Sequence, residues 1–248
     1  MNALSVRGIE KAYGGVKALR GLSFDVDAGE VVAMIGPNGA GKTTCFDILG
    51  GQLRPDRGRV SLGGRPVTGL PPQQRWRLGL GRTFQLAATF GSMTVRENVQ
   101  VALLSHARRL WSPRPGAVRA QARAAEALLD RVGIAALAAR PCGELAYGDL
   151  KRVELALALA NRPSVLLMDE PTAGMALQER LELMRLVTRL ARDERVALLF
   201  TEHDMDVVFG HADRILVLAA GETIADGPPA AIRGDARVRA LYLGDDDA

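Results

Sequence analysis

One eight-residue segment has the residue types and spacing of a loop that binds phosphate groups. It reads Gly36-Pro37-Asn38-Gly39-Ala40-Gly41-Lys42-Thr43 and is followed by Thr44. It matches the pattern GxxxxGK[ST], in which glycines let backbone N–H groups surround phosphate oxygens and the following helix directs its positive end at the same charge. Lys42 would contact the β- and γ-phosphates of a nucleotide, and the Thr43 hydroxyl would bind Mg²⁺.

A second pair of candidate residues, Asp169 and Glu170, ends the apolar run VLLM. A strand buried on both faces delivers such acids to the carboxyl edge of a parallel sheet, where ligands bind. Asp169 would hold Mg²⁺ directly or through water, and Glu170 would orient and activate an attacking water. The alternative is structural, because two acidic residues are also common where a strand simply passes into a loop. The complete phosphate loop upstream favours the catalytic interpretation.

The apolar pattern predicts the elements that position these residues. Residues 3–35 contain short β-type runs, which predict a small antiparallel sheet leading into a buried strand, and residues 42–53 predict a helix closed by Gly50 and Gly51. Between about 85 and 161 strand-like runs are absent, so we expect an inserted helical subdomain. Its clearest helical spacing is that of Val118, Ala122, Ala125, Leu129 and Val132.

Three further apolar runs, SVLLMDE, RVALLFTE and RILVLAAG, predict a parallel sheet covered by helices. Residues 221–248 predict a hairpin at GETIADG, one short helix and an acidic end. The fold class is therefore α/β, with an antiparallel β part and an inserted α-helical part.

Composition sets limits on the class of protein. The 248 residues are 48% hydrophobic, enough for one large domain or two subdomains with a shared core. No apolar stretch is long enough for a membrane span and the N-terminus lacks a signal peptide, so we expect the protein in the cytoplasm. Cys45 and Cys142 show no metal or disulfide spacing and are expected to be buried. The net charge of +4 is too small to indicate nucleic-acid binding.

Taken in order, these segments resemble the ATP-binding cassette (ABC) ATPases over nearly the whole chain. The resemblance implies a P-loop NTPase core at residues 1–85 and 161–220, which includes the antiparallel β subdomain. It also implies a helical subdomain at 86–160 and a C-terminal tail at 221–248. ATP and Mg²⁺ are the implied ligands, and two cassettes are expected to pair head to tail around them.

The same resemblance assigns further residues. Tyr13 matches the aromatic residue that stacks on adenine, although a turn tyrosine packed on the small sheet is the alternative. Gln85 matches the glutamine that contacts Mg²⁺ and senses the nucleotide. His203 matches the histidine that contacts the γ-phosphate. The other histidines, His106 and His211, are interpreted as solvated or structural.

The segment Leu145, Ala146, Tyr147, Gly148 and Asp149 occupies the place of the family motif LSGGQ and departs from it at three positions. In the family this motif caps the nucleotide of the partner cassette. Ala146 lacks a hydroxyl that would hydrogen-bond the γ-phosphate, Asp149 adds negative charge near phosphate, and Ala176 replaces a common aspartate. These departures predict two unequal ATP sites.

Several segments resemble more closely the ATPase subunits of importers for branched-chain amino acids and related solutes such as urea or amides. They are GRTFQ, TVRENVQVAL, LAYG, EPTAGM, TEHDMDVVF and VRALYLG. The resemblance implies three kinds of partner: a second ATPase, transmembrane permease subunits and an external or periplasmic solute-binding protein. It implies no nucleic-acid partner. It also implies that the chain is a peripheral protein on the cytoplasmic face of the membrane. The membrane subunit is expected to dock near Phe84, Phe90 and Val95.

Alternatives remain open at this point. The ATPase motifs alone do not separate an importer from an exporter, and a soluble ABC ATPase outside transport is a third possibility. The basic set Arg108, Arg109, Arg114, Arg119 and Arg123 could face anionic lipid headgroups or form a solvated helical face. The transported solute cannot be inferred from this chain.

Overall fold

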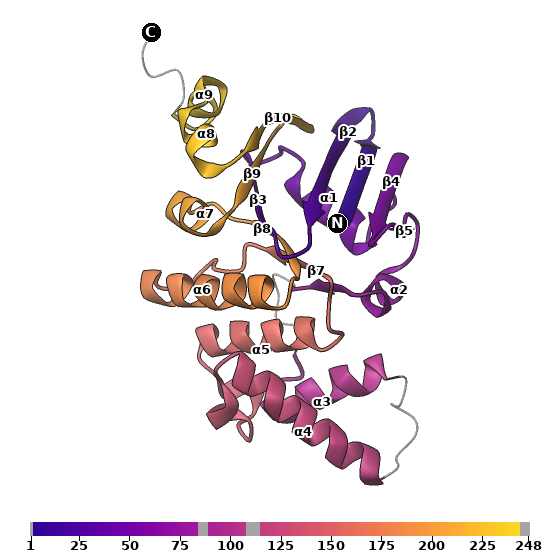
Figure 1. The fold of residues 1–248 in the computed structure, drawn as a ribbon, viewed down its shortest axis with the longest axis vertical. Helices are drawn as coiled ribbons and strands as arrows, with labels where there is room; N and C mark the ends of the chain where they lie inside the picture. The colour runs from indigo at the N-terminus through magenta and orange to yellow at the C-terminus, as the bar shows by residue number, and fades with distance from the viewer. Residues whose placement is uncertain (1, 84–88, 108–114, 244–248) are drawn as a thin grey trace.

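The computed structural model describes residues 2–83, 89–107 and 115–243 and arranges them in two sheets with helices around them (Figure 1). The first sheet is wholly antiparallel, with the order β2-β1-β4-β5. Its strands are β1 (Asn2–Tyr13), β2 (Val16–Asp27), β4 (Arg57–Leu62) and β5 (Arg65–Pro66). Apolar residues such as Leu4, Val6 and Ile9 are buried along β1. The predicted antiparallel sheet is therefore present.

The second sheet has six strands in the order β10-β9-β3-β8-β7-β6, and only the β9–β10 pair is antiparallel. The strands are β3 (Val31–Ile35), β6 (Leu80–Arg82), β7 (Val165–Asp169), β8 (Ala197–Thr201), β9 (Arg214–Ala219) and β10 (Glu222–Gly227). Every residue of β3, β7 and β8 is buried because both faces of this sheet are covered. The three predicted parallel strands are thus confirmed.

Helices cover the second sheet and form a separate group at the bottom of Figure 1. The helices are α1 (Lys42–Gly50), α2 (Pro72–Arg77), α3 (Val95–His106), α4 (Pro115–Arg131), α5 (Tyr147–Leu159), α6 (Leu177–Asp193), α7 (Met205–His211), α8 (Pro229–Gly234) and α9 (Ala236–Leu243). Within 86–160, the described residues contain α3, α4 and α5 and no strand, as the apolar pattern predicted.

The predicted helical spacing is confirmed on α4, where Ala125 and Leu129 face the core, and Val132, directly after the helix, is buried with them. Ala122 is half-buried, and the side chain of Val118 lies outside the described residues. On α3, Thr94 and Glu97 form a capping box that fixes the start of the helix.

The six-stranded sheet divides the apolar core into two clusters. Successive residues of β3 alternate between them: Val31 and Ala33 pack with the helical side, whereas Val32 and Met34 pack with α1 and the antiparallel sheet. Cys45 and Cys142 are both free and buried, as expected. Burial raises the pKa of the Cys45 thiol to about 12, so this side chain acts as an apolar residue.

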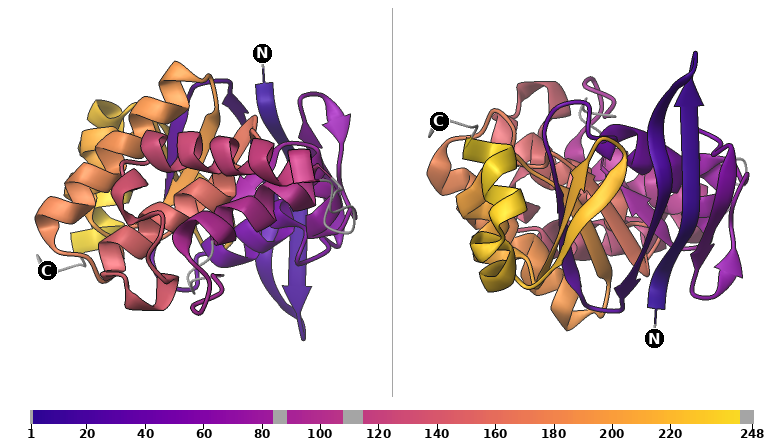
Figure 2. Two further views of the ribbon diagram at one scale, coloured as in Figure 1. Left: turned by 90° about the horizontal axis from the view of Figure 1, so that it is seen from below. Right: turned by 90° about the horizontal axis from the view of Figure 1, so that it is seen from above.

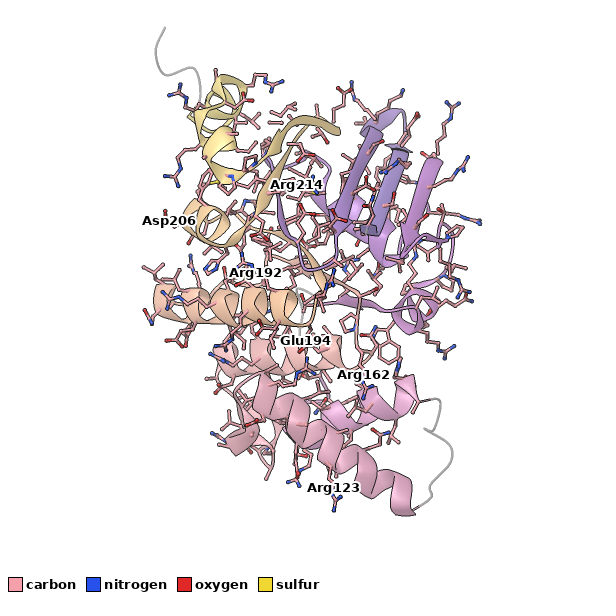
Figure 3. The ribbon with its side chains drawn as sticks, in the orientation of Figure 1. Arg123, Arg162, Arg192, Glu194, Asp206 and Arg214 are labelled. Carbon is pink, nitrogen blue, oxygen red and sulfur yellow. The ribbon has the colours of Figure 1, made fainter. Side chains whose placement is uncertain are left out.

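The two sheets are joined where β2 runs beside the β9–β10 hairpin (Figure 2). Arg214, labelled in Figure 3, links these parts by donating to Glu30, to Asp226 and to the carbonyl oxygen of Asp25. Burial alone would lower the pKa of Arg214, but its bonds to the two carboxylates raise it above its ordinary value. The guanidinium therefore remains charged and fixes the position of β2 against β9.

Two predictions for residues 221–248 are wrong in detail. The hairpin turns earlier than expected, because ETIADG forms the single strand β10 that pairs with β9. Two short helices, α8 and α9, follow instead of one, since Asp235 ends α8 and its carboxylate then accepts from the backbone N–H of Arg237. The five residues 244–248 lie outside the described residues. Among the described helices, none is both long enough and apolar enough to cross a membrane.

Candidate functional site

The phosphate loop connects β3 to α1, and close packing requires glycine at two of its positions. A Cβ on Gly36 would lie 2.2 Å from the carbonyl oxygen of Leu218, and one on Gly41 would lie 2.6 Å from that of Ala18. Gly41 also has φ 104°, which side-chain-bearing residues rarely adopt. The neighbouring strands therefore hold the loop in one shape.

Backbone hydrogen bonds fix the loop from the side of the β9–β10 turn. Gly221 donates to Ala40 and in turn accepts from Arg20 of β2. Within the loop, Asn38, Gly39 and Thr43 are exposed, whereas Pro37 and Thr44 are half-buried. The exposed groups and the first turn of α1 form a surface of the kind that binds anions.

Lys42 is buried at the start of α1. Its Nζ donates to the carbonyl oxygens of Gly36 at 2.5 Å and Pro37 at 3.1 Å. Burial lowers the pKa of Lys42, and the charges of Glu170 and Asp169 oppose that shift. The ammonium group therefore lies between the loop and the carboxylates at the end of β7.

Asp169 and Glu170 are both held by one threonine of the neighbouring strand. Thr201 Oγ1 donates to Asp169 Oδ1 at 2.6 Å and accepts from the backbone N–H of Glu170 at 3.0 Å. Asp169 also lies 3.9 Å from Arg82, which pairs closely with Asp47. Glu170 has φ 47°, an uncommon backbone conformation for this residue type that is often found at functional sites.

His203 follows β8 and reaches the same place. Its Nε2 lies 2.9 Å from Glu170 Oε1. The preceding residue, Glu202, is buried and accepts from the backbone N–H and the hydroxyl of Thr172. This second carboxylate thereby positions the loop that follows Glu170.

The structure thus brings together Lys42, Asp169, Glu170 and His203, but it does not bring in every residue selected from the sequence. Tyr13 ends β1 and is half-exposed, with the Lys11 ammonium 5.8 Å from its ring. Gln85 lies outside the described residues.

The segment 145–149 lies at the start of α5, away from the phosphate loop. Gly148 packs beside Met175 and Glu179, and Tyr147 packs beside Gly174. Figure 1 shows α5 and α1 separated across the strands of the second sheet. Leu145 is half-buried, and Ala146 and Tyr147 are exposed. The fold therefore does not bring this segment to the phosphate loop of the same chain.

Three residues of the site were missed by the sequence analysis: Thr201, Arg82 and Glu202. Thr201 and Glu202 could have been found, because they end the apolar run RVALLFTE at the same sheet edge as Asp169 and Glu170. Arg82 gave no such signal, since β6 has only three residues and no readable periodicity.

A groove of about 430 Å³ lies between α2, α3 and α5. Its apolar wall includes Trp76, Leu80, Phe90, Val101 and Leu157. Phe90 is 58% exposed and fits the expected docking region, and Phe84 lies outside the described residues. Val95 is fully buried against the core, so including it in a docking surface was wrong.

The comparisons with known proteins agree with this geometry. The family model described as ABC transporter matches residues 19–173, and that described as Branched-chain amino acid ATP-binding cassette transporter matches residues 222–248. The chain is 40% identical to the high-affinity branched-chain amino acid transport ATP-binding protein LivG of Salmonella typhimurium, over 98% of both chains.

Two further comparisons extend the match. The chain is 38% identical to the lipopolysaccharide export system ATP-binding protein LptB of Acidithiobacillus ferridurans, over 98% of this chain and 97% of that one. A crystal structure of an ABC transporter cassette in its ADP conformation superposes with a TM-score of 0.87 at 32% identity, covering 99% of this chain and 100% of the other. The phosphate loop, the β7 carboxylates and these matches together show that the chain belongs to the ATP-binding cassette ATPases of the ABC transporter family.

Proposed function

We propose that this chain is the ATP-hydrolysing subunit of an importer for branched-chain amino acids or related small solutes. The observation that carries the proposal is the full-length similarity to LivG, together with the match of residues 222–248 to the branched-chain amino acid transporter model. The ATPase site described above supports the catalytic half of the proposal.

In hydrolysis, Lys42 would exchange its bonds to the Gly36 and Pro37 carbonyl oxygens for the β- and γ-phosphates. The backbone N–H groups of the loop from Asn38 to Thr44 would hold the remaining phosphate oxygens. Glu170 would accept a hydrogen bond from the attacking water, and His203 would hold Glu170 and contact the γ-phosphate. Catalysis of this kind comes mainly from positioning and charge stabilisation.

The residues present also fit Mg²⁺. Thr43 offers an exposed hydroxyl and Asp169 a carboxylate, and oxygen ligands of this kind suit a hard cation. No cluster of three or more His, Cys, Asp or Glu side chains in the described residues forms a cage for a metal. Mg²⁺ usually keeps waters and phosphate oxygens as ligands. Gln85 would be a further ligand. The ion would supply charge neutralisation at the phosphates.

Pairing with a second cassette would complete the site. The N-terminal turn of α5, with Leu145, Ala146, Tyr147, Gly148 and Asp149, would cap the nucleotide held by the partner's phosphate loop. Tyr147 and Leu177 are large and exposed on the described surface, as a pairing face requires. Ala146, Asp149 and Ala176 would make the two ATP sites unequal. Tyr13 would stack on the adenine.

The α2–α3–α5 groove would dock a membrane subunit, and the chain would then lie on the cytoplasmic face of the membrane. An apolar groove with an exposed Phe90 suits an inserted amphipathic helix. Arg123 is exposed on α4 (Figure 3), which agrees with either a solvated or a lipid-facing helix. The side chains of the other four arginines of that set lie outside the described residues.

The test is to extract native membranes gently, capture this chain and identify the proteins that accompany it. We expect two polytopic membrane proteins, a second ATPase and, after reconstitution, hydrolysis stimulated by a solute-binding protein loaded with leucine, isoleucine or valine. Recovery of the chain without membrane proteins would refute the transport function.

A second candidate is the ATPase of an exporter, because the similarity to LptB covers almost the same share of both chains. The match of residues 222–248 favours the importer. The same capture separates the two, since an exporter complex would contain no solute-binding protein partner and its hydrolysis would not respond to amino acids.

A further inference from the structure

A buried ion pair on α5 is not used by the hydrolytic site. Lys151 Nζ lies 3.0 Å from Glu154 Oε2, and the two side chains are 7% and 6% exposed. Removing both charges from water costs free energy, and a buried pair of apolar residues would often be at least as stable. The pair therefore calls for a role other than stability.

Glu154 faces the groove. It lines the groove together with Trp76, Ala102 and Leu157. Its second oxygen, Oε1, is shielded from solvent and accepts no hydrogen bond from any described residue. A buried carboxylate oxygen without a donor is costly, so a donor that enters the groove would be bound favourably.

Lys151 also contacts the first turn of α5. Its ammonium lies 5.3 Å from the centroid of the Tyr147 ring, within the range of a cation–π interaction. Tyr147 is half-exposed in the first turn of the helix, in the segment that would cap the partner's nucleotide. Three contacting groups, Tyr147, Lys151 and Glu154, thus run from the pairing face to the groove.

We propose that Lys151 and Glu154 are a positioning pair that transmits occupancy of the groove to the nucleotide-capping turn of α5. A hydrogen-bond donor of the docked membrane subunit binds Glu154 and changes how strongly Glu154 holds Lys151. Lys151 then shifts relative to the Tyr147 ring, which alters the position of the capping turn. The inference rests on the proposed function, because it takes the groove as the docking site and the turn as the nucleotide cap.

Neither residue belongs to the segments proposed to contact the nucleotide, so they differ in kind from Glu170. Their substitution should change the response to the membrane subunits and leave the chemical step alone. A purely structural pair would instead lower stability and all activities together.

The test uses the assembled transporter carrying Glu154→Gln, Glu154→Leu, Lys151→Met or the Lys151→Met/Glu154→Leu double change. We expect the basal hydrolysis of the purified cassette pair to stay within about two-fold of wild type. The ratio of stimulated to basal hydrolysis should fall by about five-fold or more, while the KM for ATP of the purified cassette pair stays unchanged. The double variant should lose no more than the single ones, because both act through one contact. Glu222→Gln, an exposed carboxylate on β10, is the matched control.

A second readout works whether the complex imports or exports. Coupling between two sites is reciprocal, so ATP should change the affinity of the cassette pair for the membrane subunits in wild type and not in the variants. The proposed importer function and the positioning role of Lys151 and Glu154 can thus fail separately. A wild-type complex whose hydrolysis does not respond to amino acids refutes the importer. The effect of ATP on the affinity for the membrane subunits still tests Lys151 and Glu154 in that case.

Two results would overturn the inference. One is retention of both the stimulation ratio and the ATP-dependent affinity in Glu154→Leu. The other is an equal fall of basal and stimulated hydrolysis, which would mean that Glu154 acts directly on Asp169 through the small cavity that both residues line with Thr83.

Discussion

His203 Nε2 lies 2.9 Å from Glu170 Oε1, at the ends of the adjacent parallel strands β8 and β7. The contact follows from register, because Asp169 and Thr201 are direct partners in the β7–β8 ladder. The residues that follow each strand therefore lie side by side. Glu170 has a positive φ of 47° directly after β7. Sheet register brings the two residues together.

Replacement of Glu170 by glutamine should nearly abolish hydrolysis and leave ATP binding intact. Glutamine keeps the size and can still bond His203, but it cannot accept a proton from water. Loss of a general base costs about 10²- to 10⁴-fold in turnover. Single-turnover hydrolysis and nucleotide-binding titrations of the cassette pair check this, with Glu182→Gln as a surface control. Full turnover in Glu170→Gln would show that another group activates the water.

Replacement of Thr201 by valine should impair both stability and hydrolysis. Valine has the same shape, but it removes the donor to Asp169 in a fully buried place, whereas the Glu170 N–H keeps its bond to the backbone carbonyl oxygen at position 201. Each buried polar group left without a partner costs about 1–3 kcal/mol. Urea denaturation and steady-state hydrolysis measure the two effects.

Thr188→Val provides the matched control for this change. Thr188 is also buried, but its hydroxyl bonds only carbonyl oxygens of its own helix. We expect a smaller loss of stability and unchanged turnover. If Thr201→Val and Thr188→Val lowered turnover equally, the threonine bridge would have no special part in placing the carboxylates.

Much of this site could be predicted from the sequence, because its residues lie at the ends of strongly apolar strands. The glycines and Lys42 have a fixed spacing, and Asp169, Glu170 and His203 each follow a buried run. The sequence predicted less where the role of a residue depends on contacts between segments that are distant in the chain. β6 is too short to show periodicity, and Arg82 acquires its role only by lying between Asp47 and Asp169.

Buried charges on helices were also hidden in the sequence. Arg75 is almost fully buried and donates to the carbonyl oxygens of Ile48, Leu49 and Leu70. Burial lowers its pKa to about 10. Nothing in the string PPQQRWR distinguishes this arginine from its exposed neighbour Arg77. Only the end of α1, with its unpaired carbonyl groups, explains why Arg75 is enclosed.

Replacement of Ala146 by serine should increase turnover in the assembled complex. Ala146 is the N-cap of α5 and makes no side-chain capping bond. A serine there would cap the helix, which typically adds about 1 kcal/mol of stability. Its hydroxyl would also be free to bond the γ-phosphate on the partner cassette. Steady-state hydrolysis and thermal unfolding check the two effects. A stabilised variant with unchanged turnover would show that backbone N–H groups suffice to cap the nucleotide.

The contribution of Glu154 to stability should fall as pH rises. Burial raises its pKa above the ordinary 4.5, and the bond from Lys151 only partly opposes this. The folded chain therefore holds this proton at a pH where the unfolded chain has lost it. The stabilisation is complete below pH 4.5 and disappears as pH passes the raised folded value. Urea denaturation between pH 5 and pH 8 should thus show the unfolding free energy of wild type falling relative to that of Glu154→Gln, by about 1.4 kcal/mol for each unit of pKa difference. A difference that does not vary with pH would mean that Glu154 titrates alike in the folded and unfolded chains.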